Sequence, residues 1–174
     1  MIKKYIYEFN ECDPKKCSGH KMVKLNKVIS INTHQKFFGI LLSPIGKKIF
    51  SKKDLNKINN YGIGLIDCSW NKIKEFNFGK ICQNTPLYLH RILPLLIAAN
   101  PINYGKPYKL NCVEALGGAL YIVGLKDEAK KVFDGFSYGN EFFKINYELL
   151  EEYVKCETEN EIRICENKYI TKYT

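Results

Sequence analysis

The sequence predicts an α/β protein in which a parallel sheet occupies the N-terminal part and an all-α part follows. Up to about residue 100, short and almost wholly apolar runs alternate with stretches that can form helices, as in sheets whose strands are covered on both faces. After Tyr108 the apolar residues recur at helical spacing only. We therefore expect a basic α/β domain over residues 1–99 and an α-helical domain over residues 100–174.

The alternation in the first part can be followed element by element. We expect strands at 2–8, 27–32, 37–42, 62–68 and 95–99. We expect helices between them at 14–25, 51–60, 70–76 and 87–92. Ser51, with Asp54 three residues later, has the spacing of a helix-capping box. Strands separated by helices in this way predict parallel pairing.

The second part begins with a helical pattern at Leu110. Its apolar face ends at Gly124, a residue typical of helix C-termini. Further helices are expected at 128–133 and 142–154.

The segment between the two parts is dense in turn residues. The apolar run 95–99 changes abruptly into Asn100-Pro101, Asn103-Tyr104-Gly105 and Pro107. In parallel sheets, ligands collect where strands end and helices begin. A simple connection seldom needs so many turn residues, so we favour a small-molecule site here over an ordinary strand-to-helix loop.

Composition and charge narrow the function class. The chain has 174 residues and no run of the about 18 consecutive apolar residues that a membrane span requires. Its start lacks a secretory signal, so a cytoplasmic protein is expected. The net charge is +9, with thirteen lysines against four acidic residues in 1–60, whereas 111–174 is net acidic. This segregation predicts a polyanionic partner, without distinguishing RNA from DNA.

Two further patterns are compared with known chemical sites. Cys12-x4-Cys17 with His20 has the spacing of the start of a metal or iron–sulfur site, but no further ligands follow closely. We therefore expect no metal and reduced thiols. The segment 39–48 resembles a phosphate loop, but its glycine spacing is wrong and no Ser or Thr follows Gly46-Lys47. A nucleotide triphosphatase is therefore excluded.

A series of motifs covers nearly the whole chain: Cys12-Asp13-Pro14-Lys15-Lys16-Cys17-Ser18-Gly19, Leu42-Ser43-Pro44, Asp67-Cys68-Ser69-Trp70, Arg91-x-Leu93-Pro94, Ala98-Ala99-Asn100-Pro101-x-Asn103-Tyr104-Gly105 and Leu110-Asn111-Cys112-Val113-Glu114-Ala115. These motifs, in this order, resemble those of one known family, the small-subunit ribosomal RNA aminocarboxypropyltransferases. The resemblance implies an enzyme that transfers the 3-amino-3-carboxypropyl group of S-adenosylmethionine to a modified pseudouridine or uridine during ribosome biogenesis. It also implies a SPOUT-like deep trefoil knot, which periodicity alone would never suggest.

The resemblance assigns positions in the donor site. It implies an apolar slot for the adenine, backbone contacts to the adenine and ribose, and two anchors for the amino-acid carboxylate. The slot would comprise Leu42, Pro44, Trp70, Leu93, Leu110 and Ala115, with backbone contacts from Leu93, Tyr108 and Ile66. The anchors would be Ser18 and the amide of Cys112. Ser18 is expected near an early helix turn and Cys112 at a helix start, where unpaired N–H groups attract anions.

The choice of transferred group would follow from orientation of the sulfonium. If Trp70 covers the methyl, the γ-carbon of the aminocarboxypropyl arm faces the nucleophile. Asp67 would be the general base, or would offset the sulfonium charge, or would cap a helix. A lone Trp is most often a core residue, which is the alternative for Trp70.

The RNA partner would be held by basic side chains, for which solvated surface is the alternative. The candidates are Lys15, Lys16, Lys21, Lys24 and Arg91. We expect a monomer that needs neither metal nor membrane. Two other functions stay open: a SPOUT-type RNA methyltransferase, and a non-catalytic RNA-binding factor in ribosome assembly.

Overall fold

The computed structural model describes residues 1–8, 17–67 and 78–173. These residues form two compact units, which we describe separately. The first comprises residues 1–47 and 56–92, and the second comprises residues 48–55 and 93–174. The division into domains 1–99 and 100–174 stays a prediction.

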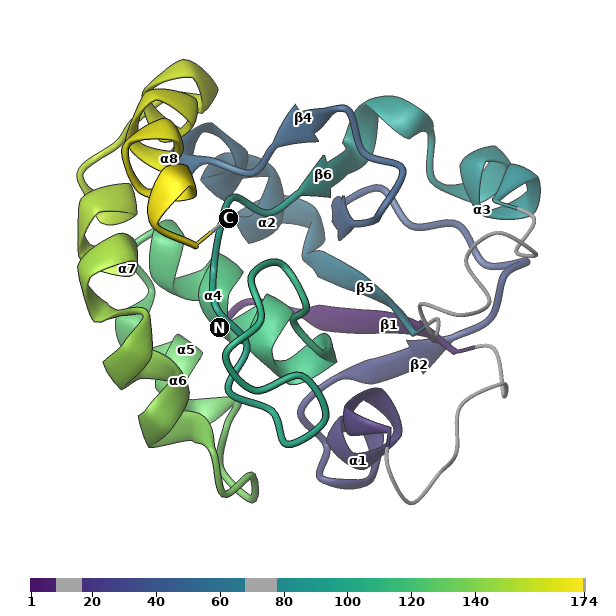
Figure 1. Cartoon of the computed structure of the whole chain (residues 1–174). Coiled ribbons are helices and arrows are strands. Elements are labelled where there is room, and N and C mark those ends of the chain that lie inside the picture. The colour runs from purple at the N-terminus through teal and green to yellow at the C-terminus, as the bar shows by residue number, and fades with distance from the viewer. Residues whose placement is uncertain (9–16, 68–77, 174) are drawn as a thin grey trace. The chain divides into compact units, whose positions relative to one another are not determined.

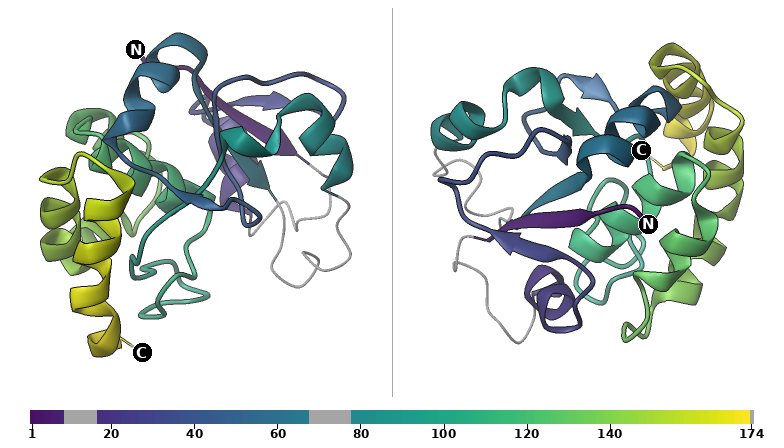
Figure 2. Two further views of the ribbon diagram at one scale, coloured as in Figure 1. Left: turned by 90° about the horizontal axis from the view of Figure 1, so that it is seen from above. Right: turned by 180° about the vertical axis from the view of Figure 1, so that it is seen from behind.

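The first unit contains the predicted parallel sheet (Figures 1 and 2). Its strands are β1 Lys4–Glu8, β2 Ile29–Ile31, β3 Ile40–Leu42, β5 Ile63–Asp67 and β6 His90–Ile92. They follow the spatial order β2-β1-β5-β3-β6, and every one of these pairs is parallel. The α/β class is therefore confirmed.

Helices of the first unit cover most of the expected positions. They are α1 Ser18–Lys24, α2 Leu55–Tyr61, α3 Gly79–Asn84 and a short 3-10 helix at Leu87–Leu89. The expected helix 87–92 is wrong in its second half, because His90–Ile92 pairs with β3 as β6. The expected helix 70–76 lies outside the described residues.

The core of the first unit includes a cluster of aromatic and aliphatic side chains. Tyr7, Phe37, Leu41 and Ile81 are buried together. The Tyr7 hydroxyl donates to the carbonyl of Gln35 at 2.8 Å, so the polar end of this ring is also satisfied. Burying such side chains stabilises the unit by roughly 1.5–3 kcal/mol each.

The predicted capping box at Ser51 is confirmed. The Ser51 hydroxyl accepts from the amide of Lys53, and the Asp54 carboxylate accepts from the amide of Ser51 at 3.2 Å. The box starts a 3-10 turn at Lys52–Asp54 that leads directly into α2. Helix α2 ends at Gly62, whose φ of +94° lies in the left-handed region that favours glycine.

The second unit is mainly helical, as expected. It contains β4 Lys48–Ile49 and the helices α4 Cys112–Ile122, α5 Lys126–Lys131, α6 Gly139–Ile145, α7 Tyr147–Val154 and α8 Glu159–Tyr173. Helix α4 packs against α5 and α7, and α7 packs against α6 and α8. No helix in the described part of the chain is long and apolar enough to cross a membrane.

Two helix boundaries in this unit differ from the sequence prediction. Helix α4 begins at Cys112 and not at Leu110, because Asn111 caps it: the Asn111 side chain accepts from the amide of Glu114. The single helix expected over 142–154 is two helices that break at Asn146. The expected end of α4 is confirmed, since Gly124 has a φ of +91°.

Candidate functional site

The apolar segment 95–99 is buried, but it is not the strand that its composition predicts. Among the described residues, its only β-type backbone pairing is an isolated bridge between Ile97 and Pro107. Side chains supply the missing partners. Asn146 accepts from the amide of Ile97 at 2.7 Å and donates to the Ile97 carbonyl at 2.8 Å. An asparagine thus satisfies both backbone groups of one residue, as a neighbouring strand would.

The start of the segment is held by helix α8 and the end of α7. The Glu166 carboxylate accepts from the amide of Leu95 at 2.7 Å, and the Tyr153 hydroxyl donates to the Leu95 carbonyl at 2.9 Å. The same Glu166 oxygen accepts from the hydroxyl of Tyr108 at 2.8 Å. Helix α8 therefore contacts both the start of the buried segment, at Leu95, and Tyr108, directly after the turn-rich loop.

Tyr108 has a φ of +64°, which is uncommon for a residue with a side chain. Its amide donates to the carbonyl of Leu96 at 3.0 Å. Burial and the Glu166 carboxylate both raise the pKa of the Tyr108 hydroxyl, so this hydroxyl remains a donor at neutral pH. The strained backbone is held by bonds at both its amide and its side chain.

Glu114 joins the end of the buried segment to the start of helix α4. One carboxylate oxygen accepts from the amides of Ala99 and Asn100, at 2.6 and 3.1 Å. The other accepts from the Asn100 side chain at 2.6 Å and from the Asn111 amide at 3.1 Å. The side chain has no exposed surface. Burial raises the pKa of Glu114, and the four hydrogen bonds oppose this rise.

The predicted donor-site residues of the second unit lie in this braced region. Leu93, Leu110, Cys112 and Ala115 are all partly exposed, although Val113, Glu114 and the residues after Ala115 in α4 are buried. Cys112 and Ala115 are three residues apart and share one face of the first turn of α4. The expectation that Cys112 begins a helix is confirmed.

In the first unit, the two neighbours of Ser18 in the chain approach Asp67. Ser18 is the first residue of α1, four residues after the expected helix start at 14, and Asp67 ends β5. The thiol of Cys17, which precedes Ser18, lies 3.1 Å from both oxygens of the buried Asp67 carboxylate. A Cβ atom on Gly19 would lie 2.8 Å from the side chain of Ile6 and 3.1 Å from that of Asp67. Only glycine lets the first turn of α1 approach the carboxylate this closely.

Sequence reasoning missed a second carboxylate beside Asp67. The parallel register of β1 and β5 pairs Glu8 with Asp67 at the carboxyl ends of both strands. One Glu8 oxygen is buried without a hydrogen-bond partner among the described residues. The register depends on pairing over long sequence distances, so no local pattern indicated it.

Leu42 ends β3, and Pro44 lies in the turn that follows this strand. The Ser43 amide donates to the Arg91 carbonyl at 2.9 Å, and the Ser43 hydroxyl lies 2.8 Å from Nδ1 of His90. Nε2 of His90 lies 2.9 Å from the Thr85 carbonyl, to which it donates. In this tautomer Nδ1 accepts from Ser43, so a neutral imidazole fixes the turn.

The buried His90 predicts a loss of stability in acid. Burial lowers the pKa of His90 below its ordinary value of 6.5. The unfolded chain therefore binds more protons, and the stabilisation is fully present above that value and declines as pH falls below it. Between about pH 7.5 and about pH 5.5, the free energy of unfolding, measured with urea, should fall more in the wild type than in His90→Gln. Equal slopes against pH in the two proteins would contradict this assignment.

The basic candidates are only partly within the described residues. Lys21 and Lys24 are exposed on α1. Arg91 is partly buried, and its Nη1 donates to the carbonyls of Tyr88 and His90, at 2.7 and 3.0 Å. These bonds fix the guanidinium on its own unit. Lys15, Lys16 and Trp70 lie outside the described residues.

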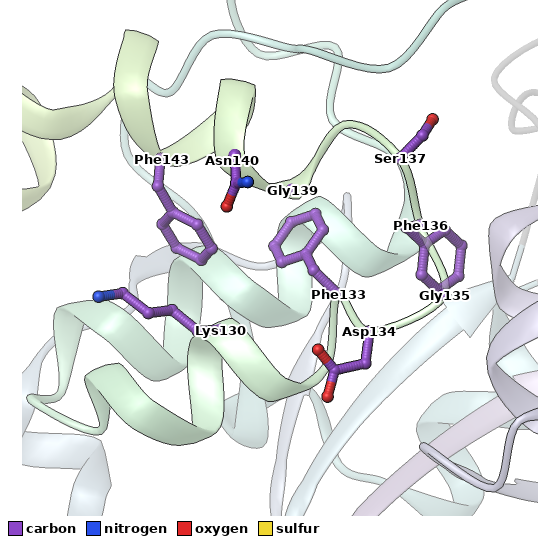
Figure 3. A pocket seen from close by; sticks show the side chains of 9 residues that line it. All are labelled: Lys130, Phe133, Asp134, Gly135, Phe136, Ser137, Gly139, Asn140 and Phe143. Atoms are coloured by element: carbon purple, nitrogen blue, oxygen red, sulfur yellow. The ribbon is translucent and has the colours of Figure 1, made fainter.

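A separate hollow of about 530 Å³ lies between α5 and α6 (Figure 3). Phe133, Phe143, Lys130 and Asn140 are among its lining residues. None of the predicted site residues lines it. This hollow is therefore a feature of the helical unit alone and not part of the predicted donor site.

The cysteines in the described part of the chain do not form a metal site. No cluster of three or more His, Cys, Asp or Glu side chains there could hold a metal ion. Cys17, Cys82, Cys112, Cys156 and Cys165 carry reduced thiols. Cys12 lies outside the described residues.

Comparisons with known proteins identify the class of this protein. A family model described as "Ribosome biogenesis protein, C-terminal" matches residues 40–170. A second model, described as a possible Fer4-like domain in RNase L inhibitor, matches residues 2–36. The fold and the longer match define a ribosome biogenesis protein built on a parallel α/β sheet.

Full-length relatives identify the family. A 16S rRNA aminocarboxypropyltransferase of Methanosphaera stadtmanae is 42% identical over 98% of both chains. An 18S rRNA aminocarboxypropyltransferase of Schizosaccharomyces pombe is 39% identical over 95% of this chain, which spans 56% of that relative. The chain belongs to the family of 16S and 18S rRNA aminocarboxypropyltransferases.

A solved structure supports the same assignment. The S-adenosylmethionine-dependent rRNA aminocarboxypropyl-transferase Tsr3 of Vulcanisaeta distributa superposes with a TM-score of 0.82. It is 31% identical, and the match covers 99% of this chain and 98% of that one. The resemblance drawn from the sequence motifs is thus confirmed.

Proposed function

We propose that this protein transfers the 3-amino-3-carboxypropyl group of S-adenosylmethionine to a modified pseudouridine or uridine in small-subunit ribosomal RNA. The observation that carries the proposal is the full-length similarity to rRNA aminocarboxypropyltransferases, including one with 98% coverage of both chains. The braced loop and the two helix starts, at Ser18 and Cys112, support it because the residues that should anchor the donor carboxylate both begin helices.

The family motifs supply the proposed donor-contact positions, and each unit carries some of them. In the first unit these are Ser18, Leu42, Pro44, the Ile66 carbonyl and Trp70. In the second unit they are Leu93, the backbone of Tyr108, Leu110, the Cys112 amide and Ala115. The partial exposure of Leu93, Leu110, Cys112 and Ala115 supports this assignment, since a bound adenine needs apolar surface that water can otherwise reach.

The reaction would form a bond between a base nitrogen and the γ-carbon of the aminocarboxypropyl arm. The C–S bond breaks, and its electron pair leaves with sulfur as methylthioadenosine. The nitrogen loses its proton. Asp67 is the proposed base or counter-charge to the sulfonium, and its thiol donor Cys17 would hold the carboxylate in place.

Labelled donor tests this function directly. Purified protein is incubated with unmodified small-subunit rRNA and with S-adenosylmethionine labelled, in parallel, on the methyl or on the carboxyl carbon. Carboxyl label in RNA, with methylthioadenosine released, is expected. Methyl label alone would make the protein a methyltransferase. Failure to bind the donor at all would favour a non-catalytic assembly factor.

The basic residues of α1 give a second expected result. Replacing Lys21 and Lys24 by Ala should weaken RNA binding and reduce the slope of log K against log salt by about 0.7 for each phosphate that is no longer neutralised. The matched control is Lys168→Ala with Lys172→Ala on α8, in the acidic half of the chain. Equal slopes in both double variants would refute a role for α1 in RNA binding.

The finer features of the family belong to the same proposal. We propose a deep trefoil knot of the SPOUT type in the N-terminal part, as the motif resemblance implies. We also propose a monomer that acts in the cytoplasm. Size-exclusion chromatography with light scattering measures the first of these two properties, and fractionation of the source cells measures the second.

A further inference from the structure

The loop between β6 and α4 can be followed along the backbone in Figure 1, and its exposed side chains are apolar and basic. Ile102 is 70% exposed and Tyr104 is 58% exposed. Lys106 and Lys109 are also exposed. No acidic residue occurs between residues 100 and 111. Aromatic rings among lysines are typical of surfaces that bind single-stranded nucleic acid.

The loop backbone is held by hydrogen bonds, although its most apolar side chains are exposed. The Asn103 amide donates to the Asn100 side chain at 2.9 Å, and the Gly105 amide donates to the Ala98 carbonyl at 2.8 Å. Gly105 has a φ of +82°, with open space around the position of a Cβ. Turn residues and backbone hydrogen bonds thus shape the loop, while Ile102 and Tyr104 keep more than half of their surface exposed.

The Tyr104 ring is held at its polar end. Its hydroxyl donates to the Glu141 carboxylate of α6 at 2.7 Å. This bond is the main reason that the pKa of Tyr104 is raised, so the hydroxyl stays protonated at neutral pH. A ring restrained in this way loses little conformational entropy when a planar group stacks on it.

We infer that the loop 101–109 is a contact site for the unpaired part of the RNA substrate, with Tyr104 stacking on a base and Lys106 and Lys109 pairing with phosphates. The inference rests on the proposed function and adds residues of the second unit to the proposed RNA contacts. Charge complementarity favours RNA as the occupant, since the loop carries only positive charge. Unpaired bases, unlike paired ones, offer a free face for stacking.

Three variants at exposed tyrosines test the stacking. Tyr104→Ala removes the ring, and Tyr104→Phe keeps the ring but removes the bond to Glu141. Tyr147→Ala is the matched control, because Tyr147 is 60% exposed in the same unit but begins α7, outside the loop 101–109. The probe is a fluorescently labelled RNA hairpin whose loop carries the unpaired uridine of the small-subunit rRNA substrate.

We expect Tyr104→Ala to raise the Kd for this hairpin about tenfold, and Tyr104→Phe and Tyr147→Ala to stay within about twofold of wild type. S-adenosylmethionine binding, measured by calorimetry, should be unchanged in all three. An unchanged Kd in Tyr104→Ala, or an equal loss in Tyr147→Ala, would overturn the inference while labelled transfer by the wild type leaves the proposed function intact. If the wild type transfers no label, the proposed function fails instead.

Discussion

Replacing Glu114 by Gln should destabilise the protein by about 3 kcal/mol and weaken S-adenosylmethionine binding more than tenfold. Both Glu114 oxygens accept two hydrogen bonds each, from N–H donors of Ala99, Asn100 and Asn111. A glutamine amide must turn its NH₂ group toward two of these donors. The side chain is fully buried, so no water can accept the hydrogen bonds that are lost.

The effect on the donor follows from the position of Glu114. Its bonds join the end of segment 95–100 to the residue that caps α4, directly before the proposed carboxylate anchor at Cys112. Losing them should let the loop and the helix start move independently. Urea unfolding measures the stability, and calorimetry measures the donor Kd.

Glu166→Gln is the matched control for this prediction. Glu166 is also a buried glutamate that braces the same segment. Its two hydrogen bonds, from Leu95 and Tyr108, go to one oxygen. A glutamine oxygen can accept both, so stability should change by less than about 1 kcal/mol. If both variants lose stability equally, the loss of the negative charge, and not the number of hydrogen-bond acceptors lost, sets the stability of this region.

Replacing Asn146 by Asp should destabilise the protein by a similar amount. This loss of stability should shrink in acid, whereas the loss assigned to His90 grows in acid. The Asn146 amide donates to the carbonyls of Ile97 and Phe142, at 2.8 and 2.9 Å. An aspartate of the same shape would place an oxygen against both carbonyls, in a position without exposed surface. We expect a loss of about 3 kcal/mol at neutral pH.

Protonation should partly rescue Asn146→Asp. Burial beside two carbonyls raises the pKa of the introduced carboxyl above its unfolded value, so the folded state binds more protons and the deficit shrinks as pH falls. Urea unfolding at about pH 7.5 and about pH 5 measures this, with Asn140→Asp as the control at an exposed position of α6. A loss of stability that does not change with pH would show that it comes from altered packing and not from the missing Asn146 amide donor.

Local signals predicted much of the fold. Apolar runs identified β1, β3 and β5 to within a few residues, and Ser51 with Asp54 predicted the capping box that starts the turn before α2. Gly124 marked the end of α4. These features depend on neighbours within about four residues, so the sequence states them directly.

Only those residues of the candidate site that belong to a sequence motif could be predicted. The motifs named Ser18 and Cys112 as donor anchors, and these residues begin α1 and α4; their role in binding the donor stays a proposal. The run 95–99 looked like a strand because it is apolar, yet Asn146 and Glu166, 49 and 71 residues away from the amides they bind, take the place of a neighbouring strand. Glu8 beside Asp67 was missed for the same reason.

The sequence by itself determined the α/β class, the capping and turn residues, the basic N-terminal half and, through its motifs, the family. Tertiary structure decided how the turn-rich loop is held, which carboxylates are buried, and where Tyr104 is exposed. The physical reason is distance along the chain. Hydrogen-bond partners that lie tens of residues apart meet only after folding, and no local period or composition records which buried amide each polar side chain will satisfy.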